Sequence, residues 1–404
     1  MTPDRKGRQH RKQPKKRAKR AAQRRKLLIG LAVAAAVLIG CSVMLITRGP
    51  SAGQGETTET TAPSTTIHFV AGGDLNITDG VVAAGGSRYD YTRTFMDVAH
   101  LLADADLAAL NLEGNLCGAP YGADSAPVEL AQALDRAGVD LVQLANSYSI
   151  SRGLSGLAQT INNIRYAGME PLGVYPDQEQ ARQGKGYTIC NVNGIKVGVV
   201  AFTKGMDGLA LPANGKGCVN VLYTDYDSVY QTVDTAGISA VMDELNKEAP
   251  DITIAMLHWG SEYNDTISAS QKKIVSLLQQ KGADAIVGTH SHYVQKMEYD
   301  PETGAFVAYS LGDFFGDVPR AGTEYSVLLD LEITKDHATG KTKITGYSYT
   351  PIFSVTQDGV PDRVMRIHEA MAAYEAGHID AVSKGIYDDM AYALTRIKAR
   401  VAGE

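Results

Sequence analysis

The N-terminal segment of the chain constrains its fold most, because it requires a membrane. Residues 1–26 contain thirteen Lys or Arg and one acid, Asp4, and Leu27–Ile46 follows as twenty residues without a charge. A helix of about 20 apolar residues spans the hydrocarbon core of a bilayer. Basic flanks stay in the cytoplasm, so the chain after Arg48 is expected on the far side. We therefore predict a single-pass protein of the cell membrane, with a basic cytoplasmic tail (1–26), a transmembrane helix (27–46) and an extracytoplasmic C-terminal part.

Two other interpretations of this segment remain open. A cleaved signal peptide has the same order of basic and apolar residues, although the apolar run is long and no small-residue cleavage site clearly follows it. Leu38-Ile39-Gly40-Cys41 resembles the acylation site of a bacterial lipoprotein, although apolar residues continue past Cys41. All three interpretations place the remaining chain outside the cytoplasm, and two of them leave it anchored.

Charge is distributed unevenly along the chain. The net charge is −6, and the 26 basic and 44 acidic residues that follow residue 26 give −18. Such an acidic domain repels polyanions at long range, which argues against nucleic acid as a partner, whereas the basic tail suits anionic membrane lipid. Residues 47–66 are rich in Ser, Thr, Gly and Glu, and they are predicted to form a flexible linker because they cannot build a core.

Residues 67–404 have the length and pattern of one large α/β domain. Short apolar runs alternate with amphipathic stretches such as Gly156–Tyr166 and Ser270–Gln280. Asn193-Gly194 predicts a hairpin between Tyr187–Val192 and Ile195–Phe202. The buried strands predicted from apolar runs are Ile67–Ala71, Leu107–Leu112, Val139–Leu144, Ile252–Leu257, Asp284–Val287 and Ala305–Tyr309.

The C-terminal third of this domain follows a different pattern. Strands are expected near Tyr325–Ile333 and Lys343–Tyr349 with no helix between them, which favours a sheet-rich α/β sandwich over a doubly wound sheet. A helical tail, roughly Pro361–Val401, is expected to close the chain. Of the three cysteines after the linker, Cys190 and Cys218 are compatible with a disulfide, but with Cys117 they do not form a framework.

Polar side chains follow the predicted strands at the point where each strand ends. The strand ends read Gly72-Gly73-Asp74, Asn111-Leu112-Glu113-Gly114, Ala145-Asn146-Ser147-Tyr148, His258-Trp259-Gly260 with Glu262 beyond, Gly288-Thr289-His290-Ser291-His292 and Ser310-Leu311-Gly312-Asp313. Ligands of open α/β sheets bind outside the carboxyl ends of the strands. We therefore expect these carboxylates and imidazoles to converge on one edge.

The residue types at this edge indicate a metal site. A single Asp after a strand is usually a turn residue, and a single His such as His258 is more often structural. His290 and His292 would face the same way on an extended chain, and the recurrence of such groups at one topological position favours a shared ion. Mixed histidine and carboxylate ligands suit manganese, zinc or iron, and two such ions would clamp a phosphoester oxygen and activate water.

Taken together and in this order, the motifs resemble the capsule-synthesis protein CapA family (poly-gamma-glutamate biosynthesis). The resemblance covers roughly Ile67–Phe315, and the most specific motifs are His-Trp-Gly-Ser-Glu-Tyr from His258 and Gly-Thr-His-Ser-His from Gly288, with Ser-Leu-Gly-Asp-Phe downstream. It implies a calcineurin-like metallophosphoesterase sandwich, in which helices flank two sheets, and one or two divalent ions (Mn, Zn or Fe). The metal ligands that it implies are Asp74, Glu113, His258, His290 and His292.

Other polar residues of these motifs are candidates for substrate contact. They are Asn111, Asn146, Trp259, Glu262 and Asp313. For Trp259, the only Trp in the chain, a place in the hydrophobic core is an equal alternative.

The third motif departs from the family pattern, which usually reads Ala-Asn-Asn-His and has an Asp three residues later. Ser147 stands where related phosphoesterases have an Asn that bridges the metals, Tyr148 occupies the position of the catalytic His, and Ser151 that of the Asp. Tyrosine, with an ordinary pKa near ~10, is a weaker acid than imidazole, and loss of a general acid costs about 10² to 10⁴ in rate. Asp313 replaces the Asn of the family's Ser-Leu-Gly-Asn-Phe and adds a negative charge that binds metal or repels an anionic substrate.

Two kinds of function are compatible with this pattern. The first is a metal-dependent hydrolase or transferase that acts on a cell-surface polymer, with a slow or altered reaction. The second is a non-catalytic anchor or export component that binds an anionic polymer such as polyglutamate and associates with membrane synthase or export subunits.

Overall fold

The computed structural model describes residues 63–184, 186–378 and 382–404, which belong to a compact unit from Ala62 to Glu404. The predicted cytoplasmic tail, the predicted transmembrane helix and residues 47–62 of the predicted linker lie outside the described residues. Among the described residues, no helix combines the length and the apolar content needed to cross a membrane. The first strand begins at Ser64, so the last three residues of the predicted linker belong to a sheet.

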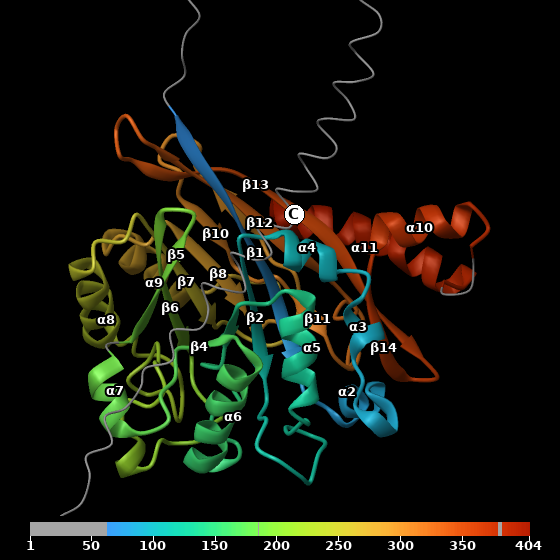
Figure 1. Ribbon diagram of the computed structural model, residues 1–404, viewed down its shortest axis with the longest axis horizontal. Coiled ribbons are helices and arrows are strands. Elements are labelled where there is room, and N and C mark those ends of the chain that lie inside the picture. Colours follow the sequence, from blue (N-terminus) through green and yellow to red (C-terminus); the bar gives the residue numbers. More distant parts are fainter. Residues whose placement is uncertain (1–62, 185, 379–381) are drawn as a thin grey trace, which may run out of the picture. The chain divides into compact units, whose positions relative to one another are not determined.

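Two β-sheets form the centre of this unit (Figure 1). The strands are β1 (Ser64–Asn76), β2 (Leu107–Glu113), β3 (Leu141–Gln143), β4 (Glu170–Leu172), β5 (Tyr187–Val192), β6 (Ile195–Thr203), β7 (Ile252–His258), β8 (Ala285–Thr289), β9 (Met297–Tyr299), β10 (Phe306–Ala308), β11 (Asp313–Phe315), β12 (Tyr325–Asp336), β13 (Thr342–Gln357) and β14 (Val360–Arg366). The larger sheet has the order β14-β13-β12-β1-β2-β3-β4, and β11 also pairs with β1; the smaller sheet has the order β5-β6-β7-β8-β10-β9. Strands β1 to β4 are mutually parallel, and so are β6, β7, β8 and β10.

Helices lie outside the two sheets. They are α2 (Asp79–Ala84), α3 (Thr92–Phe95), α4 (Ala99–Asp104), α5 (Glu129–Ala137), α6 (Gly153–Ala167), α7 (Gln178–Gly184), α8 (Thr235–Lys247), α9 (Ala269–Gln280), α10 (Ile367–Glu375) and α11 (Lys384–Ala402), with short 3-10 turns η1 (Gly86–Arg88) and η2 (Ala213–Gly215). The start of α9 follows from its sequence, because Ser268 and Gln271 form a reciprocal capping box.

Alternating side chains divide the hydrophobic core into layers. On β1, Ile67 and Phe69 point between the sheets and pack with β6 and β7, whereas Val70 packs toward α5 and α6 on the other side. On β7, Leu257 packs with α8 and α9 on the outer face of the smaller sheet. Helices α10 and α11 cover the end of the inter-sheet layer beside β12 and β13. The predicted sandwich of two sheets flanked by helices is therefore confirmed.

Several local predictions can be compared with these elements. The Asn193-Gly194 hairpin is confirmed, since both residues have positive φ (49° and 87°) and join β5 to β6. The predicted helical tail is wrong at its start, because β13 and β14 form a hairpin and helix begins only at Ile367. The suggested disulfide between Cys190 and Cys218 is also wrong, because the sulfur atoms of these two residues are not joined.

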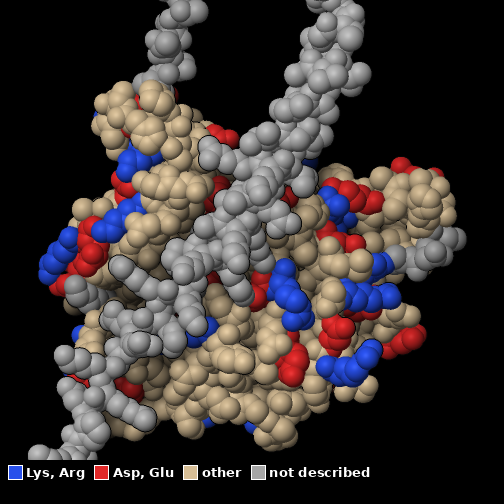
Figure 2. All heavy atoms as spheres, viewed as in Figure 1, with Lys and Arg blue, Asp and Glu red and all other residues tan. Residues whose placement is uncertain are grey.

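Charged side chains are spread over the surface of the described residues. On the face drawn in Figure 2, the described acidic and basic side chains are interspersed, and the visible part shows no extended basic area.

Candidate metal centre

The carboxyl ends of strands from both sheets meet at one place. In the larger sheet, Asp74 near the end of β1 is the register partner of Asn111 in β2. In the smaller sheet, His258 at the end of β7 pairs with Thr289 at the end of β8. The Asn111 amide donates to Asp74 Oδ1 at 2.6 Å and lies 3.3 Å from His258 Nδ1. One buried amide therefore contacts side chains of both sheets.

Within the described residues, six side chains at this place form two groups with the composition and spacing of metal ligands. The histidine-rich group is Glu113, His258 and His290, and the carboxylate-rich group is Asp74, His292 and Asp313. In each group, one ligand atom per residue lies within 4.8 Å of the others, and all six residues are buried. The structure thus brings together all five predicted metal ligands and adds Asp313, for which the sequence suggested substrate contact, metal binding or repulsion of an anionic substrate.

The histidine-rich group is centred on His258. Its Nδ1 faces Thr289 Oγ1 at 3.1 Å, and its Nε2 lies 2.8 Å from Glu113 Oε1 and 3.1 Å from Ser147 Oγ. The rings of His258 and His290 are 4.4 Å apart between centroids. Three candidate ligands from β2, β7 and the loop after β8 therefore surround one small volume.

The carboxylate-rich group lies beside the histidine-rich group. Asp74 and Asp313 are register partners in the parallel pair β1–β11, and Asp313 Oδ1 lies 2.8 Å from His292 Nδ1. Asp74 Oδ2 accepts a hydrogen bond from the backbone N–H of His290 at 2.8 Å, and Asp74 Oδ1 lies 3.8 Å from His258 Nδ1. Asp74 therefore connects the two groups.

Backbone conformation, and not strand alternation, directs His290 and His292 into the site. Both residues follow β8 in a loop and have positive φ, 90° and 60°. Such a conformation costs a non-glycine residue about 1–3 kcal/mol and is found mainly where function requires it. Our reasoning from an extended chain was wrong, although both side chains belong to the candidate groups. The hydrogen bond from His290 N–H to Asp74 offsets part of this strain.

The glycine at position 73 is explained by a close backbone approach. A Cβ there would lie 1.7 Å from the carbonyl oxygen of Gly312, and Asp74 N–H donates to that same oxygen at 3.0 Å. This contact holds the end of β1 against the turn before β11. It therefore sets the distance between Asp74 and Asp313.

Burial perturbs the ionisation of these groups strongly. It raises the pKa of Asp74 to about 7, with the nearby Glu113 charge adding to the effect, and it raises the pKa of Glu113 to about 8. It lowers the pKa of His258 to about 4 and that of His290 well below its ordinary value. For His292, the Asp313 carboxylate outweighs burial and raises the pKa to about 10. Metal ligands bind in their deprotonated forms, so an ion at this place would displace the protons that Asp74, Glu113 and His292 hold.

Several buried polar atoms of these groups lack a protein partner within the described residues, as expected if they face an ion. They include Glu113 Oε1, His290 Nδ1 and Asp313 Oδ2. Glu113 Oε1 is close to His258 Nε2, but the two atoms are not aligned for a hydrogen bond. A buried polar atom without a partner costs about 1–3 kcal/mol. Because three such atoms belong to the two groups, the residues present fit divalent metal ions.

The altered third motif lies against the histidine-rich group. The Ser147 hydroxyl contacts His258 Nε2, whereas the Tyr148 side chain is 38% exposed. Burial of its other atoms and the charges of Glu113 and Glu262 raise the pKa of Tyr148 to about 12. Ser151 accepts a hydrogen bond from Asn115 at 2.8 Å. Tyr148 therefore lies at the edge of the site but is a poor proton donor.

Asn111 and Asn146 are placed behind the site and not at its surface. Both are fully buried. The Asn146 amide donates to Asn111 Oδ1 at 3.1 Å and to Leu112 O at 2.7 Å, and its Oδ1 accepts from Tyr148 N–H. The polar atoms of both side chains already bond within the protein, and Asn111 orients Asp74. Their predicted contact with substrate stays a prediction.

Trp259 and Glu262 occupy opposite environments. Trp259 is fully buried, stacks on Tyr309 with ring centroids 5.9 Å apart, and donates from Nε1 to Tyr309 O at 2.9 Å. Its predicted substrate contact is wrong, and the core alternative is correct. Glu262 is exposed, and its charge adds to burial in raising the pKa values of Glu113 and Tyr148, so it lies near the site.

Three neighbours of the site were not identified from the sequence. Lys204 Nζ lies 3.1 Å from His290 Nε2 and donates to Gly260 O, Tyr263 stacks on His292 at 4.9 Å between centroids, and Asn76 Oδ1 is buried without a partner within the described residues. Asn76 had a detectable signal, because it follows Asp74 by two residues on a strand and so shares its face. Lys204 follows a predicted strand end that we did not treat as one of the polar ends.

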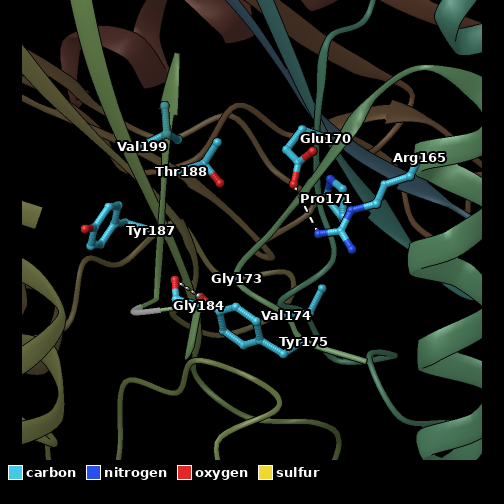
Figure 3. Close-up of a pocket in the computed structure, with 10 residues that line it drawn as sticks. All are labelled: Arg165, Glu170, Pro171, Gly173, Val174, Tyr175, Gly184, Tyr187, Thr188 and Val199. Carbon is cyan, nitrogen blue, oxygen red and sulfur yellow. Dashed lines mark hydrogen bonds and ion pairs between the residues drawn. The ribbon is translucent and has the colours of Figure 1, made fainter. Parts of the chain in front are cut away.

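A separate cavity of about 160 Å³ lies among α6, β4, β5 and β6 (Figure 3). None of the predicted site residues lines it. Its polar groups are satisfied, since Arg165 pairs with Glu170 at 3.2 Å and Tyr175 OH donates to Gly184 O.

Comparison with known proteins supports the resemblance found in the motifs. Residues 68–318 match the model of a family described as bacterial capsule synthesis protein PGA_cap. The chain is 27% identical over 215 residues to capsule biosynthesis protein CapA of Bacillus anthracis, which covers 53% of this chain and 49% of that protein. It is 26% identical over 201 residues to PGA biosynthesis protein CapA of Bacillus subtilis (strain 168), covering 50% and 48%.

The chain thus spans about half the length of these two curated relatives. Among solved structures, it is similar to the calcineurin-like phosphoesterase YfkN from Bacillus subtilis. The TM-score is 0.44 and the identity 15%, over 82% of this chain and 100% of that chain.

Proposed function

The chain belongs to the bacterial capsule synthesis protein PGA_cap family, and from this premise we propose that it acts at the cell surface in the assembly or export of a capsule polymer such as poly-gamma-glutamate. One observation carries the proposal: two groups of imidazoles and carboxylates from five separate chain segments meet at one buried edge of the sandwich. Such a convergence has no structural purpose that an apolar core would not serve better.

We propose that this site is of the calcineurin-like metallophosphoesterase type and holds one or two divalent ions, of manganese, zinc or iron. Glu113, His258 and His290 would hold one ion, and Asp74, His292 and Asp313 the other. Divalent ions at such a site polarise a phosphoryl or carbonyl oxygen and activate water. Mixed nitrogen and oxygen ligands suit these three metals.

The remaining residues of the site position these ligands. Asn111, held in place by Asn146, orients Asp74. Thr289 and Asn111 both lie against Nδ1 of His258, which leaves Nε2 directed at Glu113. Because these supports are fully buried hydrogen bonds, the ligand geometry is established before any substrate arrives.

The proposed location follows from the sequence. The basic tail and the apolar segment Leu27–Ile46 support a single-pass anchor with the domain outside the cytoplasm. The expected partners are membrane lipid, membrane-bound synthase or export subunits, and the anionic polymer itself. A metal centre supplies the positive charge that an acidic domain needs to bind a polyanion.

Binding without turnover is the second candidate function, and Tyr148 favours it. A tyrosine with a pKa of about 12 is a weak general acid at neutral pH. The chain would then hold the polymer through the metal centre and present it to other subunits.

Activity measurements with a restored third motif distinguish the two functions. The purified full-length chain, in mild detergent with Mn²⁺ or Zn²⁺, is assayed on bis(p-nitrophenyl) phosphate. Ser147→Asn with Tyr148→His is expected to raise hydrolysis by about 10²-fold or more if a missing general acid limits the reaction. Tyr166→His on α6, at a side chain 81% exposed, is the matched control and should have no effect.

A metal-loaded chain that gains no activity from the double substitution but binds poly-gamma-glutamate would support the binding function. A chain that binds neither metal nor polymer would refute both.

A further inference from the structure

The two candidate groups differ in the atoms that they offer to an ion. The histidine-rich group provides two imidazole nitrogens and one carboxylate, whereas the carboxylate-rich group provides two carboxylates and one imidazole. Asn76 increases the difference. It lies two residues after Asp74 on β1, pairs in register with Glu113, and has a buried Oδ1 without a partner within the described residues. The carboxylate-rich group therefore lies beside a further unused oxygen.

The two oxygens of Asp313 are in different situations. Oδ1 lies 2.8 Å from His292 Nδ1, in the arrangement of a carboxylate that orients a metal-binding histidine. Oδ2 is buried and has no hydrogen-bond partner within the described residues, and the residue is 3% exposed. The Asn76 side chain also interacts with the Asp313 carboxyl, but burial still outweighs it and His292 and raises the pKa of Asp313. If Asp313 only oriented His292, burial of the carboxylate would therefore be only partly compensated.

The charges of the two groups also favour Asp313 as a metal ligand. The histidine-rich group contains one carboxylate and the carboxylate-rich group two, so a divalent ion is neutralised fully only in the latter. Oxygen ligands of this kind suit manganese and magnesium, whereas imidazole suits zinc and iron. The PGA_cap resemblance does not provide this feature, since the family has Asn where this chain has Asp313.

We propose that Asp313 is itself a metal ligand through Oδ2, and that the two groups consequently select different ions: a zinc-like ion in the histidine-rich group and a manganese-like ion in the carboxylate-rich group. The inference rests on the metal-holding role proposed above. It concerns only ion selectivity, so it holds whether or not the centre hydrolyses a substrate.

Asp313→Asn tests the role of Oδ2 with little disturbance. Asn keeps one oxygen to accept from His292 and replaces the other by an amide that cannot bind a cation. His290→Asn is the matched change in the histidine-rich group, and Asn tolerates the positive φ of His290 better than most residues.

The experiment measures ion binding directly, without an activity assay. The full-length chain in mild detergent is stripped with a chelator and titrated separately with Mn²⁺, followed by electron paramagnetic resonance, and with Zn²⁺, followed by competition with a chromophoric chelator. Because zinc binds nearly all sites more tightly than manganese, each ion is compared with itself across the variants. Circular dichroism checks that each variant is folded.

A crossed pattern is expected. Asp313→Asn should weaken the tightest Mn²⁺ site at least tenfold and leave the first Zn²⁺ equivalent within threefold of wild type, and His290→Asn should do the reverse. If Asp313→Asn leaves Mn²⁺ binding unchanged, or if each variant weakens both ions alike, the inference is overturned while the metal centre stands. If the wild-type chain binds neither ion, the metal centre and the inference both fail.

Discussion

Replacing Glu113 by Gln should stabilise the metal-free protein, and increasingly so as the pH rises. Glu113 is buried, and its pKa rises from 4.5 to about 8 in the folded chain. While the Glu113 carboxyl is protonated it does not destabilise the fold, but ionising it in its buried place costs more free energy than in the unfolded chain. The stability that depends on the proton is therefore fully present below about pH 4.5 and is lost as the pH rises through about 8. Gln has nearly the same shape and no charge, so it removes this dependence.

The size of the effect follows from the shift. Each pKa unit corresponds to about 1.4 kcal/mol, so Glu113 costs the metal-free fold about 1 kcal/mol at pH 5.5 and about 4 kcal/mol at pH 8 relative to Gln. The difference between the two pH values, about 3 kcal/mol, is free of any pH-independent packing change. Loss of the Glu113 charge also lowers the pKa of Asp74, which acts in the same direction.

Denaturant unfolding of the chelator-treated full-length chain measures this difference. Trp259 is the single Trp of the chain and is fully buried, so its fluorescence reports on unfolding of the domain. The difference in unfolding free energy between Glu113→Gln and the wild-type chain should increase between pH 5.5 and 8. A difference that stays constant or decreases over that range would refute the assigned burial of Glu113. Glu179→Gln, at an exposed side chain, is the matched control.

Three further predictions test other parts of the account. Metal affinity should rise about tenfold or more between pH 6.5 and 8.5, because Asp74 (pKa about 7) and Glu113 (pKa about 8) must release protons to bind an ion. Calorimetry in two buffers of different ionisation enthalpy measures the released protons, and metal binding that does not depend on pH would contradict this prediction. Trp259→Phe should destabilise the domain by about 1–3 kcal/mol through lost packing and one lost hydrogen bond, and elemental analysis should find its metal content unchanged. Loss of metal without loss of stability would instead indicate that Trp259 belongs to the metal site. Gly73→Ala should lower the stability of the domain by more than about 2 kcal/mol and should also lower its metal content, because the new Cβ would lie 1.7 Å from Gly312 O. An unchanged melting temperature would show that the backbones at Gly73 and Gly312 are not this close in solution.

The fold was predictable where the sequence pattern is local. Apolar runs of strand length predict the central strands β1, β2, β7 and β8 because parallel strands covered on both faces are apolar at nearly every position. The Asn-Gly turn predicts the β5–β6 hairpin for an equally local reason. Short edge strands such as β4 and β9 were missed, since three residues leave no periodic signal. The β13–β14 hairpin was mistaken for helix because pairing with a distant strand, and not local propensity, decides it.

The candidate site was predictable as a set of residue types at strand ends, but not in its details. Strand topology explains why Asp74, Glu113 and His258 meet, since parallel strands end on the same side. Packing in three dimensions decides on which side of the metal ligands a neighbouring residue lies. The roles of Asn111, Asn146 and Trp259 depend on this position and could not be predicted from the sequence. For Asp313 the sequence left several roles open, and the structure favours metal binding because the pairing of β11 with β1 brings it beside Asp74.

Elemental analysis of the purified full-length chain tests the central claim most directly. The wild-type chain is expected to carry one or two ions of manganese, zinc or iron per molecule, and the double variant His290→Ala with His292→Ala to carry at least one ion fewer. The control pair His100→Ala with His378→Ala, at exposed side chains, should keep the wild-type content. A wild-type chain with no more bound metal than the His290 and His292 variant would contradict the account.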